Sequence, residues 1–413
     1  MAMSADTSNV EALDRADPLG GKRALFELPV GVIYLDGNSL GPPPKAAFAE
    51  LEAAARYEWG EGLIRSWNAA GWWSLTDTLG DRIGRLIGAG VGETVVTDTT
   101  SINVFKALHA ALALRPERRV ILAERDSFPT DLYIAEGVAA SRPDTELSLA
   151  ADSANLTDMI DERTAVMLIN HVDYRTGALR DMAYLTRRAH QAGALVIWDL
   201  CHSAGVVPIE LDVLDVDFAV GCTYKYLNGG PGAPAFIFAR RRHHDGLVQP
   251  LSGWWAHAAP FAMESGYRPA TGIRRLLCGT QPILSLRALK AALDAVEGVD
   301  ISAIRAKSLA LTGFFMELVE PICREFGCRI ITPRDEGRGS QVALAHEQAY
   351  AVVQALTDRG IIGDFRAPDI MRFGFAPLYL SYRDVADAVA ALHDVLASEA
   401  WRDAKFSTRA LVT

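Results

Sequence analysis

Continuous apolar runs alternate with helical patterns from about residue 80 onward, and this alternation constrains the fold more than any other feature of the sequence. The segments 119–126, 165–172 and 194–200 are typical of buried strands, and 101–114 and 182–193 are typical of the helices between them. Strands joined by crossover helices form a parallel or mostly parallel sheet that is covered on both faces. The sequence therefore predicts an α/β fold.

The pattern changes near residue 285, where long helical stretches at 285–299 and 303–326 lead into short strand-like pieces at 328–333 and 340–346. This change predicts a second, smaller α+β domain, for which a chain of 413 residues has ample length. The predicted parts are an N-terminal segment, 1–55, that joins the small domain, a large domain, 56–290, and the C-terminal small domain, 291–413.

Charge and cysteine content narrow the class of function. Lys and Arg number 41 against 51 Asp and Glu, so the net charge of −10 has the wrong sign for a partner of nucleic acid. Five cysteines are too few, and odd in number, for a secreted disulfide framework. Residues 1–20 lack a basic and an apolar targeting region, and no apolar run approaches the roughly 20 residues of a membrane span. We expect a cytoplasmic protein that acts on a small molecule.

The residues that carry chemistry follow two of the apolar runs. One run ends at Asp199, and the strand-like run 218–227 includes Tyr224 and Lys225 beside a Gly-rich turn. Ligands of open α/β sheets bind outside the carboxyl ends of the strands, so we expect Asp199 and Lys225 to face one crevice. Pyridoxal phosphate needs such a pair, because a lysine forms its Schiff base and a carboxylate keeps its pyridine nitrogen protonated. A plain salt bridge between Asp199 and Lys225 is the simpler interpretation. The position of the two residues at strand ends beside a Gly-rich turn disfavours it.

An anion site is predicted where helix 101–114 begins. Thr99, Thr100 and Ser101 lie at this point, and the amides and dipole of a helix N-terminus favour negative charge. Ser101 is the predicted N-cap. A simple N-cap is the plainer interpretation, but beside a Schiff-base lysine the hydroxyls indicate a phosphate site.

Seven segments of unusual composition occur in order along nearly the whole chain. They are YLDGNSLGPPP, SFPTD, DLCHSAG, CTYKYLNGGPG, GWWAH, CGTQPILSL and GDFRAPDIMRFGFAPLY. Together they resemble the kynureninase family, fold-type I pyridoxal-phosphate enzymes close to class V aminotransferases. The resemblance implies a mostly parallel seven-stranded sheet with helices on both faces and a smaller α+β domain. It also implies cleavage of the Cβ–Cγ bond of L-kynurenine by water, to give anthranilate and L-alanine, within the kynurenine pathway of tryptophan catabolism or NAD biosynthesis.

The resemblance assigns cofactor contacts to several residues. Lys225 would hold pyridoxal 5′-phosphate, Asp199 would pair with the pyridine nitrogen, and Thr100 with Ser101 would bind the phosphate. Phe128 would stack on the ring. Core packing is the plainer interpretation for an aromatic side chain such as this one.

Further residues are placed around the cofactor by the same resemblance. Asp131 would hydrogen-bond near the phenolic oxygen, Asn170 matches a cofactor-site position, and His202 would lie by the ring. Tyr224 would donate and accept the protons of the bond-breaking step. The family pattern leads us to expect a residue such as Ala where Cys201 stands, and a buried Cys behaves as a similarly small hydrophobe.

The resemblance also implies a homodimer with shared active sites. Trp254 and Thr280 would reach the phosphate of the partner subunit, and Arg372 would bind the α-carboxylate of the substrate. A planar guanidinium suits that carboxylate better than a lysine does. Thr280, in place of a larger amide, favours kynurenine over 3-hydroxykynurenine as substrate.

Three alternatives from other classes of protein can be compared with the sequence, and each has a feature against it. Residues 37–41 match the G-x-S-x-G elbow of serine hydrolases around Ser39, although prolines follow where a helix is required. Gly88, Gly90 and Gly92 stand in the wrong order for a dinucleotide-binding loop. No metal site is predicted, because His243 and His244 are expected on a solvated surface. Within the pyridoxal-phosphate enzymes, a cysteine desulfurase is the alternative, but no cysteine here has an obviously activated setting.

Overall fold

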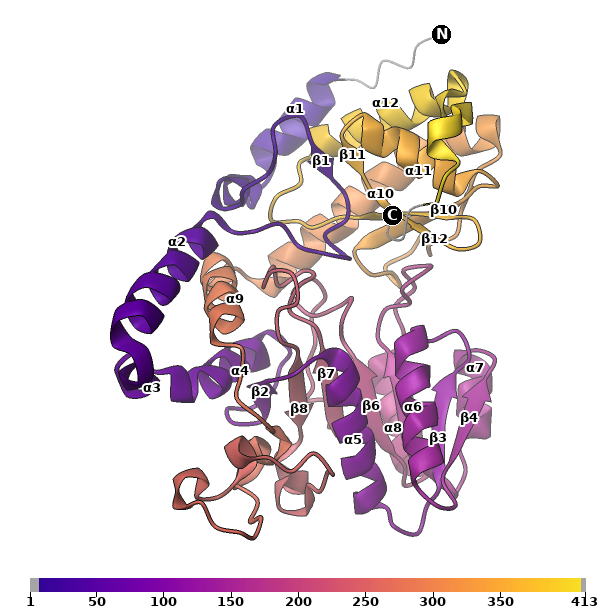
Figure 1. Ribbon diagram of the computed structural model, residues 1–413. Helices are drawn as coiled ribbons and strands as arrows, with labels where there is room; N and C mark the ends of the chain where they lie inside the picture. The colour runs from indigo at the N-terminus through magenta and orange to yellow at the C-terminus, as the bar shows by residue number, and fades with distance from the viewer. Residues whose placement is uncertain (1–6, 410–413) are drawn as a thin grey trace.

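A seven-stranded sheet forms the centre of the larger part of the molecule in the computed structural model, which describes residues 7–409 (Figure 1). In their order across the sheet the strands are β2 (Thr94–Val96), β8 (Phe236–Ala239), β7 (Phe218–Gly221), β6 (Leu195–Asp199), β5 (Thr164–Asn170), β3 (Val120–Glu124) and β4 (Glu146–Ala150). Neighbouring strands pair in parallel except at β8, which is antiparallel to β2 and β7. The predicted mostly parallel sheet is confirmed.

Helices cover both faces of this sheet because successive side chains of each strand point to opposite apolar layers. In β6, Leu195 and Ile197 join one layer, and Val196 and Trp198 join the other. The helices are α5 (Thr100–Leu114) and α6 (Pro129–Ser141) on the first face, and α4 (Leu75–Leu86), α7 (Ser153–Met159), α8 (Met182–Gln191) and α9 (Ile283–Val296) on the second. Both layers are therefore closed to water, as the continuous apolar strands require.

The start of α5 differs from the prediction, because Thr99 and not Ser101 caps this helix. Thr99 Oγ1 accepts a hydrogen bond from the backbone N–H of Ile102 at 3.4 Å, and the helix begins at Thr100. Thr99 has the extended backbone of an N-cap, with φ −111° and ψ 163°, whereas Ser101 already lies in the first turn. The Ser101 hydroxyl is thus not needed as the cap.

The C-terminal part of the chain folds as a smaller antiparallel sheet with helices. Its strands, in order, are β12 (Asp364–Arg366), β13 (Ile370–Gly374), β10 (Gln341–Ala345) and β9 (Arg329–Ile330), and its helices are α10 (Ile301–Phe326), α11 (Ala349–Asp358) and α12 (Tyr382–Ala397). The side chain of Asp300 caps α10, and Gly327 ends it with a positive φ of 74° that favours glycine.

The N-terminal segment runs alongside this smaller part before it reaches the large sheet. Its elements are α1 (Thr7–Ala16), β1 (Ile33–Tyr34), α2 (Lys45–Ala53) and α3 (Ser66–Ala69). β1 pairs in parallel with β11 (Ile361–Ile362), and Figure 1 shows α1 beside α12, whereas α2 packs against α9. We propose the division 1–55 with 291–413, and 56–290, which the pairing of β1 with β11 supports. Residues 1–6 of the first part lie outside the described residues.

None of the helices found within residues 7–409 combines the length and the apolar character that a membrane span requires.

Candidate active site

Four predicted site residues lie at the carboxyl edge of the seven-stranded sheet. Asn170 and Asp199 end neighbouring parallel strands and are partners in the register of β5 and β6. Asn170 Nδ2 donates to Asp199 Oδ2 and to Asp131 Oδ2, each at 2.8 Å. Lys225 follows β7, the next strand across the sheet. The parallel register thus brings together residues that are far apart in the sequence.

Asp131 and Asp199 form a carboxyl pair bridged by the Asn170 amide. Asp131 is buried, and this burial, followed by the charge of Asp199, raises the pKa of Asp131 well above its usual range. Asp131 therefore holds a proton. The predicted contact of Asp131 with a phenolic oxygen stays a prediction, while the structure joins Asp131 to Asp199 through the Asn170 amide.

Lys225 and His202 contact each other in the wall of the same site. Lys225 Nζ lies 3.1 Å from His202 Nε2, and both side chains are buried. Burial, and then the charges of Lys225 and Arg372, lower the pKa of His202 well below its usual range. His202 is therefore neutral and accepts the hydrogen bond that Lys225 donates. The ring of Phe128 has its centroid 5.9 Å from Lys225 Nζ.

A cavity of about 360 Å³ lies between these groups and the start of α5, which is an ordinary size for a small-molecule site. The predicted residues that line it are Thr100, Ser101, Phe128, Asp131, Asp199, His202, Tyr224 and Lys225. Asn170 stands behind them, with Oδ1 accepting from the Phe128 N–H at 2.9 Å. One cavity thus gathers most of the site predicted from the sequence.

The donor groups around the cavity fit pyridoxal phosphate. The amides and dipole of the α5 N-terminus, with the hydroxyls of Thr100 and Ser101, form a receptor for its phosphate. Lys225 supplies an amine for its aldehyde carbon, and Asp199 supplies a buried carboxylate for its pyridine nitrogen. These three kinds of group, placed around one cavity, match the three polar ends of the cofactor.

Tyr224 lies in the cavity wall beside two cysteines. Burial, and then the neighbouring Cys222, raise the pKa of Tyr224 above its usual range, so its phenol stays protonated. Cys201 Sγ accepts from the Cys222 N–H at 3.2 Å and lies 3.6 Å from Thr100 Oγ1. Cys201 is buried, as a small side chain at this place must be.

An arginine cluster, made of Ser39, Asp364, Arg366 and Arg372, lies next to the cavity. Arg372 is 1% exposed, and its Nε donates to Asp364 Oδ1 at 2.8 Å, while Nη2 contacts the other carboxylate oxygen. Ser39 Oγ donates to Asp364 Oδ2 at 2.7 Å. Arg372 Nη1 donates to the carbonyl of Tyr174, and the ring of Tyr174 packs against that of Phe128 in the cavity lining, so the cluster lies close to the cavity wall.

Of this cluster, only Arg372 was predicted from the sequence as part of the site. Sequence reasoning missed Asp364 and Arg366, and it considered Ser39 only as a serine nucleophile. The signal was present in the segment DFRAPDIMR, because β12 and β13 are antiparallel neighbours in which Asp364 and Arg372 are register partners. An aspartate and two arginines on one short hairpin lie close enough to form ion pairs with one another.

The serine hydrolase alternative lacks the structure that it requires. No helix begins directly after Ser39, since residues 42–44 are prolines and α2 begins only at Lys45. The Ser39 side chain bonds to Asp364, Arg366 and Arg372, and no histidine within residues 7–409 contacts it to act as a base. Ser39 belongs to the arginine cluster instead.

Asp36 lies three residues before Ser39, close to the arginine cluster. Burial, and then the nearby charge of Asp364, raise the pKa of Asp36 to about 8. Its Oδ1 is buried without a hydrogen-bond partner within residues 7–409. Asp36 is therefore largely protonated at neutral pH.

Asp36→Asn is expected to remove a pH dependence of stability. The folded chain holds this proton up to about pH 8, whereas the unfolded chain releases it near pH 4, so stability falls as pH rises between these values. At pH 8 the variant should gain about 1–3 kcal/mol in the free energy of unfolding, and at pH 4 it should gain almost nothing. Urea unfolding at several pH values measures this, with the exposed Asp158→Asn as control. Parallel pH curves for Asp36→Asn and wild type would contradict it.

Trp254 and Thr280 are not brought to the cavity of their own chain. Neither is among its lining residues, and both are exposed at the surface. Their segments lie together, because the Trp255 N–H donates to the carbonyl of Cys278 at 3.1 Å. The contacts predicted for them with a partner's phosphate stay a prediction.

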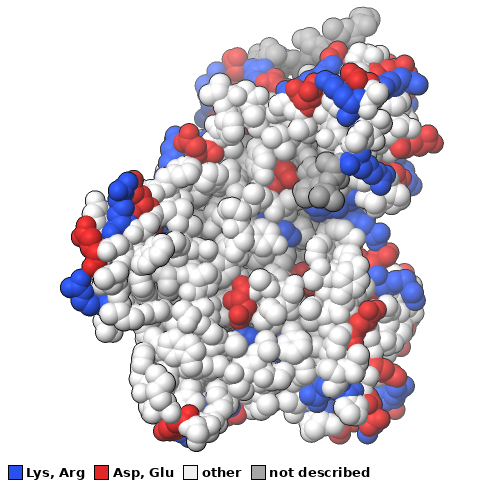
Figure 2. All heavy atoms as spheres, in the orientation of Figure 1, with Lys and Arg blue, Asp and Glu red and all other residues white. Residues whose placement is uncertain are grey.

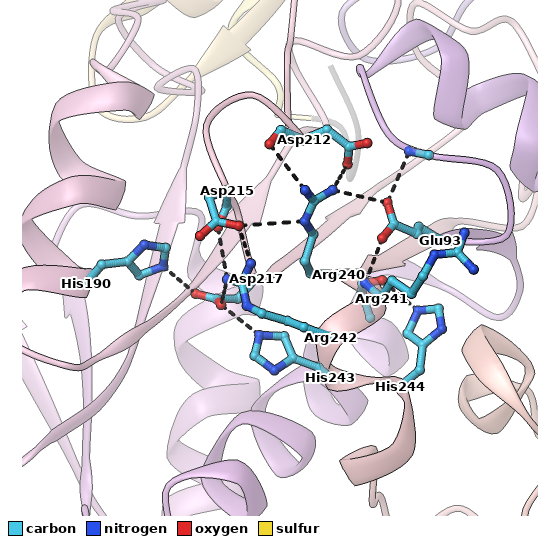
Figure 3. Close-up of polar contacts among 12 residues, drawn as sticks. Glu93, His190, Asp212, Asp215, Asp217, Arg240, Arg241, Arg242, His243 and His244 are labelled. Atoms are coloured by element: carbon cyan, nitrogen blue, oxygen red, sulfur yellow. Dashed lines mark hydrogen bonds and ion pairs between the residues drawn. The ribbon is translucent and has the colours of Figure 1, made fainter.

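The expectation that His243 and His244 lie on a solvated surface is wrong. Both are buried, and His243 Nε2 lies 2.8 Å from Asp217 Oδ1 (Figure 3). Asp217 directly precedes β7, and its Oδ2 also lies 2.8 Å from His190 Nε2. Partners from several elements thus satisfy this carboxylate at the amino end of β7, away from the end that carries Lys225.

Comparison with known proteins identifies the relatives of the chain. Residues 304–392 match the family model described as the kynureninase C-terminal domain. A kynureninase of Burkholderia pseudomallei (strain 1106a) is 55% identical over 408 residues, which cover 97% of this chain and 98% of that protein. A kynureninase of Pseudomonas fluorescens is 52% identical with the same coverage.

Solved structures resemble the chain at the level of the fold. A cysteine desulfurase from Escherichia coli has a TM-score of 0.76 at 20% identity, covering 92% of this chain and 98% of its own. A variant of C-DES with glycine covalently linked to the PLP cofactor has a TM-score of 0.77 at 16% identity, covering 90% and 99%. The desulfurase alternative therefore has only a distant similarity in its favour.

Proposed function

Because the chain belongs to the kynureninase family, we propose a division of roles among its cavity residues for the reaction of that family. The enzyme hydrolyses the Cβ–Cγ bond of L-kynurenine to anthranilate and L-alanine, with pyridoxal phosphate as cofactor. The observation that carries the assignment of roles is the single cavity that gathers Lys225, Asp199 and the α5 N-terminus. When bound, the cofactor supplies a sink for the electrons of the substrate.

Lys225 is the residue that we assign to the cofactor and to proton transfer at the substrate Cα. Its Nζ donates to His202 Nε2 at 3.1 Å, and the neutral imidazole orients the amine. Asp199 is the carboxylate that we assign to the pyridine nitrogen, and its place in the cavity lining beside the Asn170 amide supports this. Phe128 is assigned to stacking, and its place in the cavity lining supports this.

Tyr224 is the proposed proton donor for the cleavage step. Its phenol lies in the cavity lining and stays protonated because burial raises the pKa above its usual range. A protonated phenol can release its proton to the substrate carbon and recover one from water. Arg372 is assigned to the α-carboxylate, and its contact with Tyr174, whose ring packs against Phe128 of the cavity lining, supports that role.

The test of this function is anthranilate release. Purified holoenzyme given L-kynurenine should produce fluorescent anthranilate and one equivalent of L-alanine. 3-Hydroxykynurenine should react less efficiently, and the ratio of kcat/KM for the two substrates measures this preference. A yellow, cofactor-loaded protein that released no anthranilate would contradict the function.

A homodimer with shared sites is the proposed assembly. Trp59, Ile64, Phe261 and Met263 are 60%, 77%, 70% and 78% exposed, an unusual set of large apolar surfaces. Trp73 follows the first two of them along the chain, and its ring centroid lies 5.5 Å from that of Phe261. Figure 2 shows one face of the molecule on which few charged side chains occur across the centre, while many lie at the rim. A second copy of the chain would cover apolar surfaces of this kind.

Complementation between two inactive variants tests the sharing of sites. Lys225→Ala lacks the amine but retains Trp254, whereas Trp254→Ala retains the amine. In a mixed dimer one site receives both residues, so activity should return when the two variants are refolded or expressed together. Sedimentation measures the dimer itself. A monomeric enzyme, or a mixture no more active than its components, would contradict the shared site.

A reducing compartment, the cytoplasm, is the proposed location. All five cysteines are free, and four of them are buried. Free buried thiols are typical of proteins that are kept reduced.

A further inference from the structure

The hydrogen bonds of Arg372 leave little of its guanidinium for a substrate. Nε and Nη2 contact the two oxygens of Asp364, Nη2 also lies 2.8 Å from Ser39 Oγ, and Nη1 donates to the carbonyl of Tyr174. Arginine has five N–H donors, so these contacts use four of them. A carboxylate arriving at Arg372 therefore finds one donor on a cation that Asp364 already neutralises.

Arg366 is the second cation of the cluster and is less enclosed. Its Nη2 lies 2.7 Å from Asp364 Oδ2 and 3.3 Å from Ser39 Oγ. The side chain of Arg366 is 31% exposed, against 1% for that of Arg372. The single carboxylate of Asp364 is shared by both arginines, so the cluster keeps one positive charge, and Arg366 presents this charge because its side chain is the more exposed. A desolvated substrate carboxylate needs such a charge.

Contacts within the cluster connect Arg366 to the cavity wall. Arg366 and Arg372 both contact Ser39 Oγ and Asp364, and Arg372 donates to the carbonyl of Tyr174. The ring of Tyr174 meets that of Phe128 edge-on, with centroids 5.3 Å apart. Asp36 does not cancel the charge of Arg366 at neutral pH, because burial raises the pKa of Asp36 to about 8.

We propose that Arg366 is a second receptor for the substrate α-carboxylate, and that Asp364 is a positioning residue that holds Arg366 and Arg372 side by side. The inference rests on the proposed function and deepens it. The substrate carboxylate then balances the net positive charge of the cluster, which selects amino acids over the corresponding amines.

Arg366→Gln tests this inference in the holoenzyme. KM for L-kynurenine should rise about tenfold or more, because a charge-assisted contact is lost. The inhibition constant of kynuramine, the analogue without the carboxylate, should change less than about twofold, since that contact was never made. Arg366→Lys should recover part of the loss. Arg175→Gln is the matched control, because Arg175 lies beside Tyr174 but pairs with Asp126.

Other outcomes overturn the inference in distinguishable ways. An unchanged KM for Arg366→Gln in an active enzyme contradicts the role of Arg366 alone. Equal weakening of kynurenine and kynuramine shows a purely structural effect and also contradicts it. Wild-type holoenzyme that releases no anthranilate contradicts the proposed function, and the inference falls with it.

Discussion

Lys225→Ala is expected to lose turnover and the visible absorbance of the lysine-bound cofactor together. Lys225 supplies the only lysine amine in the lining of the cavity within residues 7–409, beside Asp199 and His202. Loss of a nucleophile that also moves a proton should lower kcat by about 10⁴-fold or more. Absorbance spectra and anthranilate release measure the two losses on one sample.

The control for this substitution is Lys290→Ala. Lys290 lies on α9 and pairs with Asp294 at 3.0 Å at the surface, so its loss should leave both signals unchanged. Thermal unfolding of Lys225→Ala should stay cooperative. Full turnover by Lys225→Ala would contradict the assignment of this lysine.

Arg372→Met is expected to weaken substrate binding and stability at once. Methionine keeps much of the buried volume but removes the cation that holds Asp364 and is placed to receive the substrate. KM for kynurenine should rise about 100-fold, because the substrate loses the remaining donor of Arg372 and the carboxylate of Asp364 then neutralises Arg366. The free energy of unfolding should fall by about 2–4 kcal/mol, because Asp364 is 1% exposed and loses one of the two cations that it contacts.

The double variant Arg372→Met with Asp364→Asn separates the two effects. Removing the buried negative charge should recover part of the stability, since no carboxylate is left in need of a cation. KM should recover only in part, because Asp364 no longer neutralises Arg366 but the substrate carboxylate still lacks Arg372. Urea unfolding and kinetics on the same preparations measure both. Full recovery of KM in the double variant would contradict a binding role for Arg372.

Much of the fold and of the cofactor site could be predicted from local sequence patterns. The continuous apolar strands require cover on both faces, which is why the parallel sheet could be predicted. Asp199 and Lys225 follow such strands, and the carboxyl ends of parallel strands meet at one edge. The resemblance supplied the roles of Phe128 and Tyr224, which lie in the cavity lining.

Contacts between distant segments could not be predicted from local sequence patterns. The cap of α5 was assigned to Ser101, although Thr99 has the required extended backbone. His243 and His244 were expected in solvent because arginines precede them, yet the buried carboxylate of Asp217 holds His243 inside.

The sequence by itself determined the parallel sheet, its apolar layers and the strand ends that carry Asp199 and Lys225, because these depend on periodicity and on neighbours along the chain. Only the tertiary structure decided that Ser39, Asp364, Arg366 and Arg372 form one cluster. Ser39 and Arg372 are 333 residues apart. Buried charges must find partners wherever folding brings them, and that pairing is a property of three-dimensional packing rather than of any local pattern.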